Sequence, residues 1–424
     1  MLTYIKNISS LCTLNKGNAF YRRGLEMQNV DEIRNAAIIF DTNILFVGTT
    51  QEAYAYIEKN QIKDIKVIDA AGKTIIPGFC DSHSHIVFAG NRSEEFARRL
   101  RGATYKEIAE EGGGILTTMR ATRQSTVDEL VEYGKKLALS ALRNGTTSLE
   151  IKSGYSLTVD GELNQLRAIK KLKEILPLNI KSTFLGAHDF PPEYKNNREK
   201  YVELIINEML PKIAEENLAD YCDAFIDEGY YTIEEAEKIF TAAKKYNIKI
   251  RTHSDEMANV EAAGFSADIG AASADHLLFI SDKSIEKIAK SSTVATMMPT
   301  TAYFIRMPYA PARKIIDNGC ITALASDCNP GSSFTENMQL VLSLAVINMK
   351  MTAEEALTAA TINGAKAMDL SEITGSLMVG KQADFIIADI DRYTDLFYHF
   401  GINHVDEVWI KGKCAANNNT DFNF

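Results

Sequence analysis

The chain has 424 residues, 46% of them hydrophobic and 24% charged, and its 46 basic and 56 acidic residues give a formal net charge of −10. This length and composition allow a large buried core and suit a large α/β barrel with an appended unit. Because the charge is negative and no lysine- or arginine-rich run interrupts it, nucleic acid and anionic membrane surfaces are not expected as partners.

Two features of the sequence favour a cytoplasmic protein. Its six cysteines are scattered and form no Cys-x-x-Cys pair, which is typical of reduced thiols in the cytosol. Its N-terminus has no basic segment followed by an apolar stretch, and no segment reaches the ~18–20 apolar residues that a membrane span needs. We therefore expect neither export nor membrane insertion.

The N-terminal part of the chain is β-rich. Residues 4–14 and 37–48 have the composition of short strands, and the turn residues 41–43 divide the second of them into the two arms of a hairpin. We expect residues 1–72 to form a small β unit.

From Thr74 onward, apolar β-prone runs alternate with segments of helical spacing. The expected strands are residues 74–80, 145–151, 179–187, 219–226, 248–252, 274–280, 292–298 and 320–326. The clearest helices between them are expected at 126–143, 161–176, 232–246 and 285–290. Alternating strands and helices predict a parallel sheet, and eight such units in roughly 250 residues predict a closed (β/α)8 TIM barrel. We assign this barrel to residues 73–372.

The chain after the eighth strand returns from helix to strand. Residues 333–349 and 352–368 are expected to form two more helices, and the second opens with a capping box at Thr352. Three β-prone runs follow, at 376–378, 383–388 and 405–411. We expect residues 373–424 to join residues 1–72, so that both chain termini build one small β-sandwich-like domain beside the α/β barrel.

A pair of histidines follows the first predicted barrel strand. His83 and His85 come after the apolar run 74–79, and side chains two apart on an extended strand point to the same face. Both imidazoles can therefore reach one metal ion. A lone His-x-His is nevertheless a weak motif, because two histidines on a solvated strand would produce it without any function.

Polar residues also follow other predicted strands, and a barrel enzyme keeps its chemistry at the carboxyl ends of its strands. These residues are 150–155, His188, 253–256 and 326–332. Asp275 and His276 lie near the start of the sixth apolar run, which indicates that the sixth strand begins earlier than this run. Five of the seven histidines thus lie beside barrel strands. Any one of them could be a hydrogen-bonded core residue, but their clustering favours a metal site.

Three neutral imidazoles and one carboxylate make a site for a divalent ion, and we expect His83, His85, His253 and Asp327 to be its ligands. Asp327 could instead be a turn residue before Asn-Pro-Gly, although the apolar run that leads into it favours a ligand. The fourth strand ends without the lysine that a bridged metal pair would need, so we expect one ion, zinc or alternatively iron. Such an ion lowers the pKa of a bound water. We expect Asp81 to stand outside the ligand set, as a supporting or structural acid that could orient a ligand.

The pattern of a His-x-His pair, two later histidines and a final aspartate on successive barrel strands resembles the amidohydrolase superfamily. Within it, longer strings resemble the imidazolonepropionase family of histidine degradation, and together they extend over nearly the whole chain. These strings are residues 83–92 (HSHIVFAGNR), 112–115 (GGGI), 121–123 (ATR), 150–155 (EIKSGY), 185–188 (LGAH), 191–194 (PPEY) and 326–332 (SDCNPGS). The chain departs from the family pattern at Ser84, Ser254 and 297–301, and none of these departures removes a functional side chain.

The resemblance implies roles for further residues. It repeats the four metal ligands chosen above, and it implies Glu256 as the catalytic acid/base and His276 as a polarising group, with Asp327 able to share the proton transfer. The substrate contacts that it implies are Arg92, Tyr105, Tyr155, His188, Glu256, Asn329, Gly331 and Ser332.

The implied enzyme is a hydrolase that acts on the carbon–nitrogen bond of a cyclic amide and opens 4-imidazolone-5-propanoate to N-formimino-L-glutamate. Arg92 would pair with the carboxylate arm of this small-molecule substrate, unless it only belongs to a solvated helix face at 92–101. Tyr155 and His188 would orient the ring, unless they are packed core side chains.

Two other interpretations stay open. Another cyclic amidohydrolase or an aminohydrolase deaminase could use the same scaffold, and a catalytically inactive barrel could serve as a binding scaffold. The intact ligand set and Glu256 argue against the inactive barrel. The sequence leaves the oligomeric state open, and a homodimer is the commonest arrangement for soluble enzymes.

Overall fold

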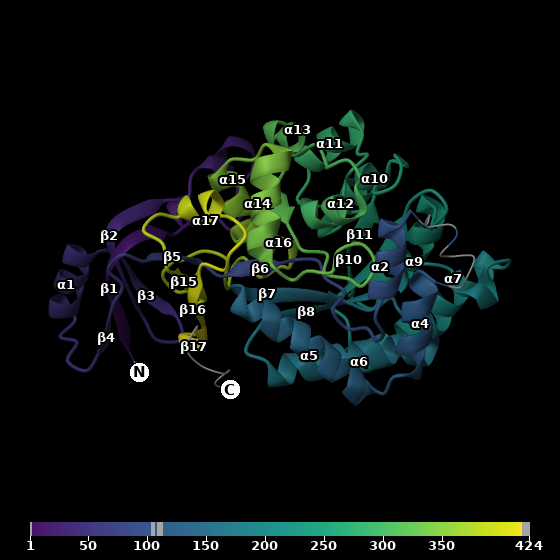
Figure 1. Ribbon diagram of the computed structural model, residues 1–424, viewed down its shortest axis with the longest axis horizontal. Helices are drawn as coiled ribbons and strands as arrows, with labels where there is room; N and C mark the ends of the chain where they lie inside the picture. The colour runs from purple at the N-terminus through teal and green to yellow at the C-terminus, as the bar shows by residue number, and fades with distance from the viewer. Residues whose placement is uncertain (1, 103–106, 108–112, 418–424) are drawn as a thin grey trace.

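The computed structural model describes residues 2–102, 107 and 113–417. Figure 1 shows two bodies: a barrel of strands ringed by helices, and a smaller β body that carries both ends of the chain. The predicted division into a barrel and a sheet built from the chain termini is therefore confirmed.

Eight parallel strands form the barrel. They are β6 (Phe79–Asp81), β7 (Thr146–Lys152), β8 (Asn179–Ala187), β9 (Tyr221–Ile226), β11 (Thr252–Ser254), β12 (Ser273–His276), β13 (Val294–Met297) and β14 (Thr322–Leu324), and the short β10 (Lys249–Ile250) pairs with β9. The ring closes through the segments that follow β6 and β14. The His85 N–H donates to the Cys328 carbonyl at 2.9 Å, and the Asp327 N–H donates to the His83 carbonyl at 3.0 Å. The closing contacts of the (β/α)8 barrel thus involve three of the predicted metal ligands.

Helices cover the outside of the barrel (Figure 1). They are α2 (Ser93–Leu100), α4 (Ile115–Gln124), α5 (Val127–Arg143), α6 (Val159–Ile175), α7 (Arg198–Leu204), α8 (Leu210–Glu215), α9 (Ile233–Lys245), α10 (Ala262–Asp268), α11 (Asp282–Ala289), α12 (Pro299–Ile305), α13 (Ala312–Asp317), α14 (Met338–Met349), α15 (Ala353–Ala360) and α16 (Ile362–Ala367). Shorter helical segments are η1 (Lys16–Asn18), η2 (Gly24–Gln28), η3 (Pro192–Tyr194) and η4 (Ile205–Met209). Thr126, Thr232 and Thr352 each form a capping box with a glutamate three residues later, which supplies partners for the first amides of α5, α9 and α15. The capping box predicted at Thr352 is therefore confirmed.

The helix predicted over 352–368 is in fact two helices, α15 and α16, divided at Thr361. The break lets α16 approach the first barrel strand very closely: a Cβ on Gly364 would lie 2.4 Å from the Cys80 carbonyl oxygen. Only a glycine leaves room for this contact, so Gly364 allows α16 to pack directly on β6.

The separate sheet unites both chain ends in the strand order β17-β16-β15-β5-β1-β2-β3, with β4 paired to β1. Its strands are β1 (Thr3–Cys12), β2 (Glu32–Phe40), β3 (Ile44–Thr49), β4 (Lys66–Asp69), β5 (Thr74–Pro77), β15 (Phe385–Ala388), β16 (Val405–Ile410) and β17 (Lys413–Asn417), and α1 (Thr50–Lys59) and α17 (Asp395–Tyr398) accompany them. The hairpin predicted around residues 41–43 pairs β2 with β3. Phe40 packs edge-to-face on Phe385 and Trp409, with ring centroids 5.2 and 5.4 Å away, so aromatic residues from opposite ends of the chain share one core.

Several predicted strands differ from the structure. Residues 376–378 form no strand, and the run 248–252 is divided between β10 and β11. The run 74–80 is two strands, because Thr74–Pro77 (β5) pairs antiparallel with β15 in the separate sheet and only Phe79–Asp81 (β6) belongs to the barrel. Gly78 permits this switch: a Cβ there would lie 2.2 Å from the Thr147 side chain of β7. The run 274–280 ends as a strand at His276, since His276 and Leu277 have φ angles of 80° and 67°, outside the β region.

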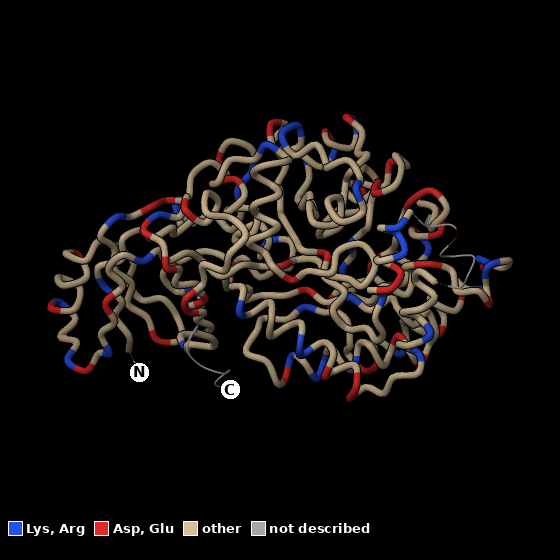
Figure 2. The backbone as a smooth tube through the Cα atoms, in the orientation of Figure 1, with Lys and Arg blue, Asp and Glu red and all other residues tan. Residues whose placement is uncertain are grey.

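None of the described helices is both long and apolar enough to cross a membrane. Over the described residues, Figure 2 shows basic and acidic positions interspersed along the outer helices.

Candidate active site

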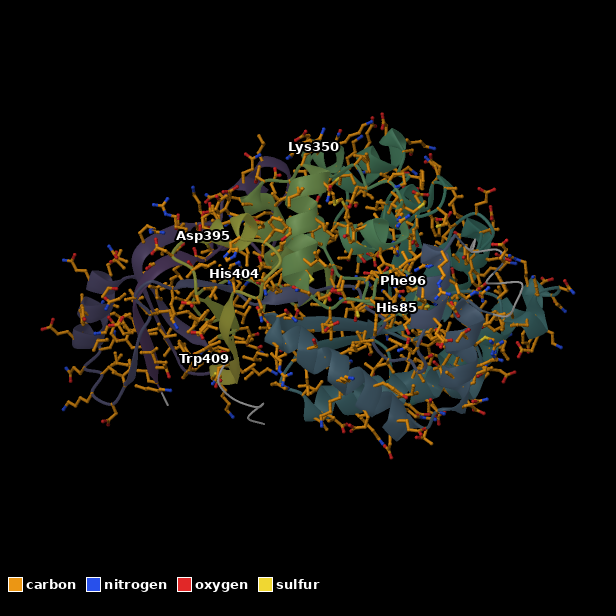
Figure 3. All side chains as sticks on the ribbon, in the orientation of Figure 1. His85, Phe96, Lys350, Asp395, His404 and Trp409 are labelled. Carbon is orange, nitrogen blue, oxygen red and sulfur yellow. The ribbon has the colours of Figure 1, made fainter. Side chains whose placement is uncertain are left out.

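The four predicted metal ligands come together at the carboxyl ends of three strands. His83 and His85 follow β6, His253 lies within β11, and Asp327 follows β14. Donor atoms of His83, His85 and His253 lie within 4.8 Å of one another, and so do donor atoms of His83, His276 and Asp327. The Nε2 atoms of His83 and His85 are 3.2 Å apart, and each lies 3.5 Å from Asp327 Oδ1. Figure 3 labels His85 within the barrel body.

Two buried aspartates orient two of these rings. Asp275 Oδ2 lies 2.7 Å from His83 Nδ1, and Asp223 Oδ2 lies 3.0 Å from His253 Nδ1. The His83 imidazole donates its Nδ1 proton to Asp275, so its Nε2 is unprotonated and offers a lone pair to the cluster of His83, His85, His253 and Asp327. Asp223 lies beside the His253 ring at ion-pair distance, without hydrogen-bond geometry. Burial lowers the pKa of His83 well below its usual value, with Lys152 and the other histidines adding to the effect, so the ring is neutral.

These donors fit a divalent ion. Ligand atoms about 2.0–2.2 Å from a tetrahedrally coordinated ion stand about 3.3–3.6 Å apart, and the separations of 3.2 and 3.5 Å between the His83, His85 and Asp327 donor atoms are close to this. Neutral nitrogen lone pairs and a carboxylate that converge in a buried space repel one another unless a cation lies between them. The cluster and the fold together indicate a divalent-metal site.

Asp327 is fixed on two sides. Its Oδ2 accepts a hydrogen bond from Thr301 Oγ1 at 2.7 Å, and its carbonyl accepts one from Asn329 Nδ2 at 2.7 Å. Burial raises the pKa of Asp327 to about 6. Asp81, in contrast, accepts hydrogen bonds from the Ser326 N–H at 2.9 Å and from the Ser326 hydroxyl at 2.5 Å, so it fixes the backbone just before Asp327 instead of contacting a ligand ring.

Glu256 and His276 lie together beside the cluster, with Glu256 Oε2 3.6 Å from His276 Nε2. Burial raises the pKa of Glu256 well above its usual value, and the nearby carboxylates of Asp327 and Asp227 raise it further. Asp227 also fixes the Glu256 backbone, because its Oδ2 accepts the N–H groups of Glu256 and Met257 at 2.7 and 2.8 Å. Neither ring nitrogen of His276 has a hydrogen-bond partner among the described residues, and burial lowers its pKa well below the usual value.

A cavity of about 410 Å³ opens beside this cluster. Of the predicted substrate contacts, the residues that line it are Arg92, Tyr155, His188, Glu256, Asn329, Gly331 and Ser332. Of the predicted metal and catalytic residues, those that line it are His85, His253, His276 and Asp327. The remaining predicted contact, Tyr105, lies outside the described residues.

One wall of the cavity carries His188. Its Nδ1 donates to the Gly154 carbonyl at 2.9 Å, which leaves Nε2 as an acceptor. This contact requires glycine at position 154, because its φ is +109° and a Cβ there would lie 2.8 Å from the Leu185 carbonyl oxygen. The His188 ring stacks on His85 with centroids 5.4 Å apart, and Tyr155 packs edge-to-face on His188 at the same separation. His188 therefore packs against a predicted metal ligand and also lines the cavity.

Arg92, at the N-cap of α2, also lines the cavity. Its side chain is only 12% exposed, and its Nε donates to Glu95 Oε2 at 2.9 Å. The guanidinium lies against Gly331, where a Cβ would be 2.6 Å from Nη1. The backbone N–H groups of Gly331 and Ser332 both donate to Asn329 Oδ1 at 2.8 Å, so Asn329 shapes this turn. Arg92 is therefore part of the cavity wall and not a solvated helix position.

His188 makes a pH-dependent contribution to stability. Burial lowers its pKa to about 4, whereas an unfolded histidine titrates near 6.5. Between these values the unfolded chain binds more protons, so stability falls as the pH drops below about 6.5. Urea denaturation of the metal-free proteins at pH 7 and pH 5 measures how far the free energy of unfolding falls between the two values. We expect this fall to be about 1–2 kcal/mol smaller in His188→Asn than in the wild type. Equal losses in the two proteins would contradict a depressed His188 pKa.

Sequence reasoning missed the buried residues that contact the predicted metal-binding histidines on the side away from the cavity. Asp223 and Asp275 orient His253 and His83, and Lys152 lies between them, 2.9 and 3.9 Å from their Oδ2 atoms. It also missed Arg99, which lines the cavity and places its guanidinium 5.3 Å from the centre of the Phe304 ring. The signal available for Asp223 and Asp275 was an acidic residue inside a buried strand, although only the strand register shows which histidine each one meets.

Comparison with known proteins agrees with this geometry. The sequence model of the amidohydrolase family matches residues 74–415. An imidazolonepropionase of Christiangramia forsetii is 43% identical over 97% of this chain and 100% of its own length, and one of Thermoanaerobacter pseudethanolicus is 44% identical over 92% of each chain. Among solved structures, a zinc-bound adenosine deaminase from Xanthomonas campestris has a TM-score of 0.72 at 17% identity, covering 99% of this chain and 94% of its own. A triazine hydrolase variant has a TM-score of 0.76 at 16% identity, covering 98% and 95%, and both structures share the fold alone.

The barrel, the buried His/Asp cluster and the match over residues 74–415 define a metal-dependent hydrolase of the amidohydrolase class. At 43% identity over nearly its whole length, the chain belongs, within this class, to the imidazolonepropionase family.

Proposed function

We propose that this enzyme hydrolyses the cyclic amide of 4-imidazolone-5-propanoate to N-formimino-L-glutamate, a step of L-histidine degradation. The observation that carries the proposal is that one cavity is lined both by Arg92 and by His85, His253, His276, Asp327 and Glu256. A ring amide with a short anionic arm has two groups to be recognised, and this cavity offers a cationic side chain for the arm and a cluster of metal-binding and acidic side chains for the amide.

His83, His85, His253 and Asp327 would hold one divalent ion. Zinc suits three imidazoles and one carboxylate, and iron is the alternative. A divalent ion bound there lowers the pKa of a water molecule and so supplies a nucleophile near neutral pH.

Glu256 moves the proton. Its raised pKa suits a group that first accepts a proton from the attacking water and then donates it to the ring nitrogen that leaves. The bond that breaks joins the ring carbonyl carbon to that nitrogen, so the carbonyl becomes a carboxylate and the nitrogen stays in the formimino group. His276, 3.6 Å from Glu256, polarises the carbonyl oxygen, and Asp327 can share the proton transfer.

The substrate is oriented by the cavity walls. His188 is neutral at physiological pH, and its Nε2 can accept a hydrogen bond from a ring N–H. Tyr155 packs edge-to-face on the His188 imidazole. The turn at Asn329, Gly331 and Ser332 shapes the space beside Arg92. Tyr105 is retained as a further substrate contact on the basis of the family resemblance.

Replacing Arg92 by methionine should raise KM for the carboxylated substrate by roughly 10–100-fold, because a charge-assisted hydrogen bond contributes about 1.5–3 kcal/mol. We expect kcat to change little, since the carboxylate arm is bound equally in the ground and transition states. Steady-state kinetics measure both constants. Arg101→Met at the exposed C-cap of the same helix is the matched control and should leave KM unchanged. An unchanged KM in Arg92→Met would remove this residue from substrate recognition.

The reaction itself is tested by adding the protein to freshly generated imidazolone propionate. We expect the ultraviolet absorbance of the substrate to decay faster, the mass of N-formimino-L-glutamate to appear, and a chelator to abolish both effects. Release of ammonia with the ring left closed would favour a deaminase instead. Purified protein without bound metal and without activity would favour an inactive scaffold.

We also place the enzyme in the cytoplasm, which agrees with its six free cysteines, and expect a homodimer acting on this small molecule. Size-exclusion chromatography with light scattering tests the dimer.

A further inference from the structure

We propose that Lys152 is a positioning residue for the metal centre: its ammonium group lies between the carboxylates of Asp223 and Asp275 and holds the two histidines that these carboxylates orient. This inference rests on the ligand set of the proposed function. It adds a residue that contacts neither the cavity nor a ligand ring, and that acts through its neighbours.

The contacts form a continuous chain on both sides of Lys152. Lys152 Nζ donates to Asp223 Oδ2 at 2.9 Å, and the same oxygen lies 3.0 Å from His253 Nδ1. On the other side, Lys152 Nζ lies 3.9 Å from Asp275 Oδ2, which is 2.7 Å from His83 Nδ1. A single ammonium group is thus linked to ligands on two different parts of the barrel.

Glu150 extends this arrangement to the segment between the first two ligands. Its Oε1 accepts from Lys152 Nζ at 3.0 Å and also from the Thr183 hydroxyl. Its Oε2 accepts from the N–H of Ser84, which lies between His83 and His85, at 3.3 Å. Lys152 therefore connects β7, β9 and β12 with the chain that follows β6.

The buried charges around Lys152 favour a cation among the proposed metal ligands His83, His85, His253 and Asp327. Lys152 and Arg251 stand among the carboxylates of Glu150, Asp223 and Asp275, and the side chains of all five are fully buried. Two cations against three carboxylates leave an excess of negative charge where no water can screen it. A divalent ion held by the histidines compensates this excess.

Stability alone does not explain such a group. Buried ion pairs cost so much desolvation that well-packed apolar residues of similar volume are often equally stable or more stable. Orientation of metal ligands gives a direct reason for keeping it, because losing a residue that orients a ligand typically weakens metal affinity about 10–100-fold.

The test compares Lys152→Met with a second buried lysine. Lys381 is 2% exposed, and its Nζ donates to Ser376 Oγ at 2.7 Å on the segment between α16 and β15, so Lys381→Met also removes a buried ammonium group but leaves the cluster intact. Zinc affinity is measured by competition with a chelator on the folded proteins. We expect a 10–100-fold weaker affinity in Lys152→Met and less than a twofold change in Lys381→Met.

Cobalt provides a reading of ligand geometry that does not depend on activity. We expect the visible absorption bands of the cobalt-loaded protein to shift in Lys152→Met and to stay unchanged in Lys381→Met. Wild-type zinc affinity and wild-type cobalt bands in Lys152→Met would overturn the inference, even if its melting temperature fell. A wild-type protein that binds neither metal would instead overturn the ligand set of the proposed function.

A double variant keeps the test decisive if Lys152→Met does not fold. Lys152→Gln combined with Glu150→Gln removes one charge of each sign and so preserves the net charge of the buried group. We expect it to fold and to bind zinc at least tenfold more weakly than the wild type. Wild-type affinity in this double variant would show that the ligands keep their positions without the lysine.

Discussion

Replacing Glu256 by glutamine should lower kcat by roughly 10²–10⁴-fold, the usual contribution of a general acid/base. The amide keeps the size and the backbone anchors of Glu256, whose N–H donates to Asp227 at 2.7 Å, but it can neither accept nor return a proton. Because Glu256 lies outside the two groups of converging metal-binding atoms, we expect the metal content to stay at the wild-type level. Stopped assays of turnover and elemental analysis of the same preparation measure the two quantities.

Glu228→Gln is the matched control for this experiment, since Glu228 is an exposed glutamate shortly after β9. It should retain full activity. Turnover within a few-fold of the wild type in Glu256→Gln would assign the proton transfer to another group, with Asp327 as the next candidate.

Replacing Asp327 by asparagine should have a different effect, because this carboxylate lies 3.5 Å from the Nε2 atoms of both His83 and His85. Loss of its charge removes an anionic ligand from the cluster, so we expect weaker metal binding as well as lost turnover. Since a bound ion contributes several kcal/mol to catalysis, activity should fall by roughly 10³-fold or more. Metal content after dialysis and kcat with added metal measure the two effects separately.

Asp189→Asn controls for the loss of a carboxylate from the same cavity, because Asp189 lines the cavity but belongs to neither group of converging metal-binding atoms. We expect it to keep its metal. If Asp327→Asn retained stoichiometric metal and lost only turnover, Asp327 would be a proton carrier and not a ligand.

The barrel could be predicted because its strands are mostly buried runs, and polar residues follow several of them. The predicted third strand, 179–187, coincides with β8, and His188 follows it directly. The change of sheet at Gly78 could not be predicted in this way. The run 74–80 is buried throughout, and only the partners of each half show that the chain passes from one sheet to the other at Gly78.

For the site, too, the sequence predicted some residues and missed others. The cavity-facing residues could be named because they follow strands or belong to strings that the family shares. The buried acids and Lys152 behind them could not be assigned, because their role depends on which strands are neighbours. Asp223 meets His253 through the parallel register of β9 and β11, and a list of strands contains no such information.

The closing contact of the barrel has a consequence beyond catalysis. The ring closes where His85 N–H meets the Cys328 carbonyl and Asp327 N–H meets the His83 carbonyl, and the proposed ligands lie on both sides of this junction. An ion bound there would cross-link the first and last strands, so metal occupancy and barrel closure become thermodynamically linked. Each tenfold rise in free metal above the dissociation constant then adds about 1.4 kcal/mol to the folding free energy. A shortage of metal would therefore shorten the lifetime of the folded enzyme as well as reduce its activity.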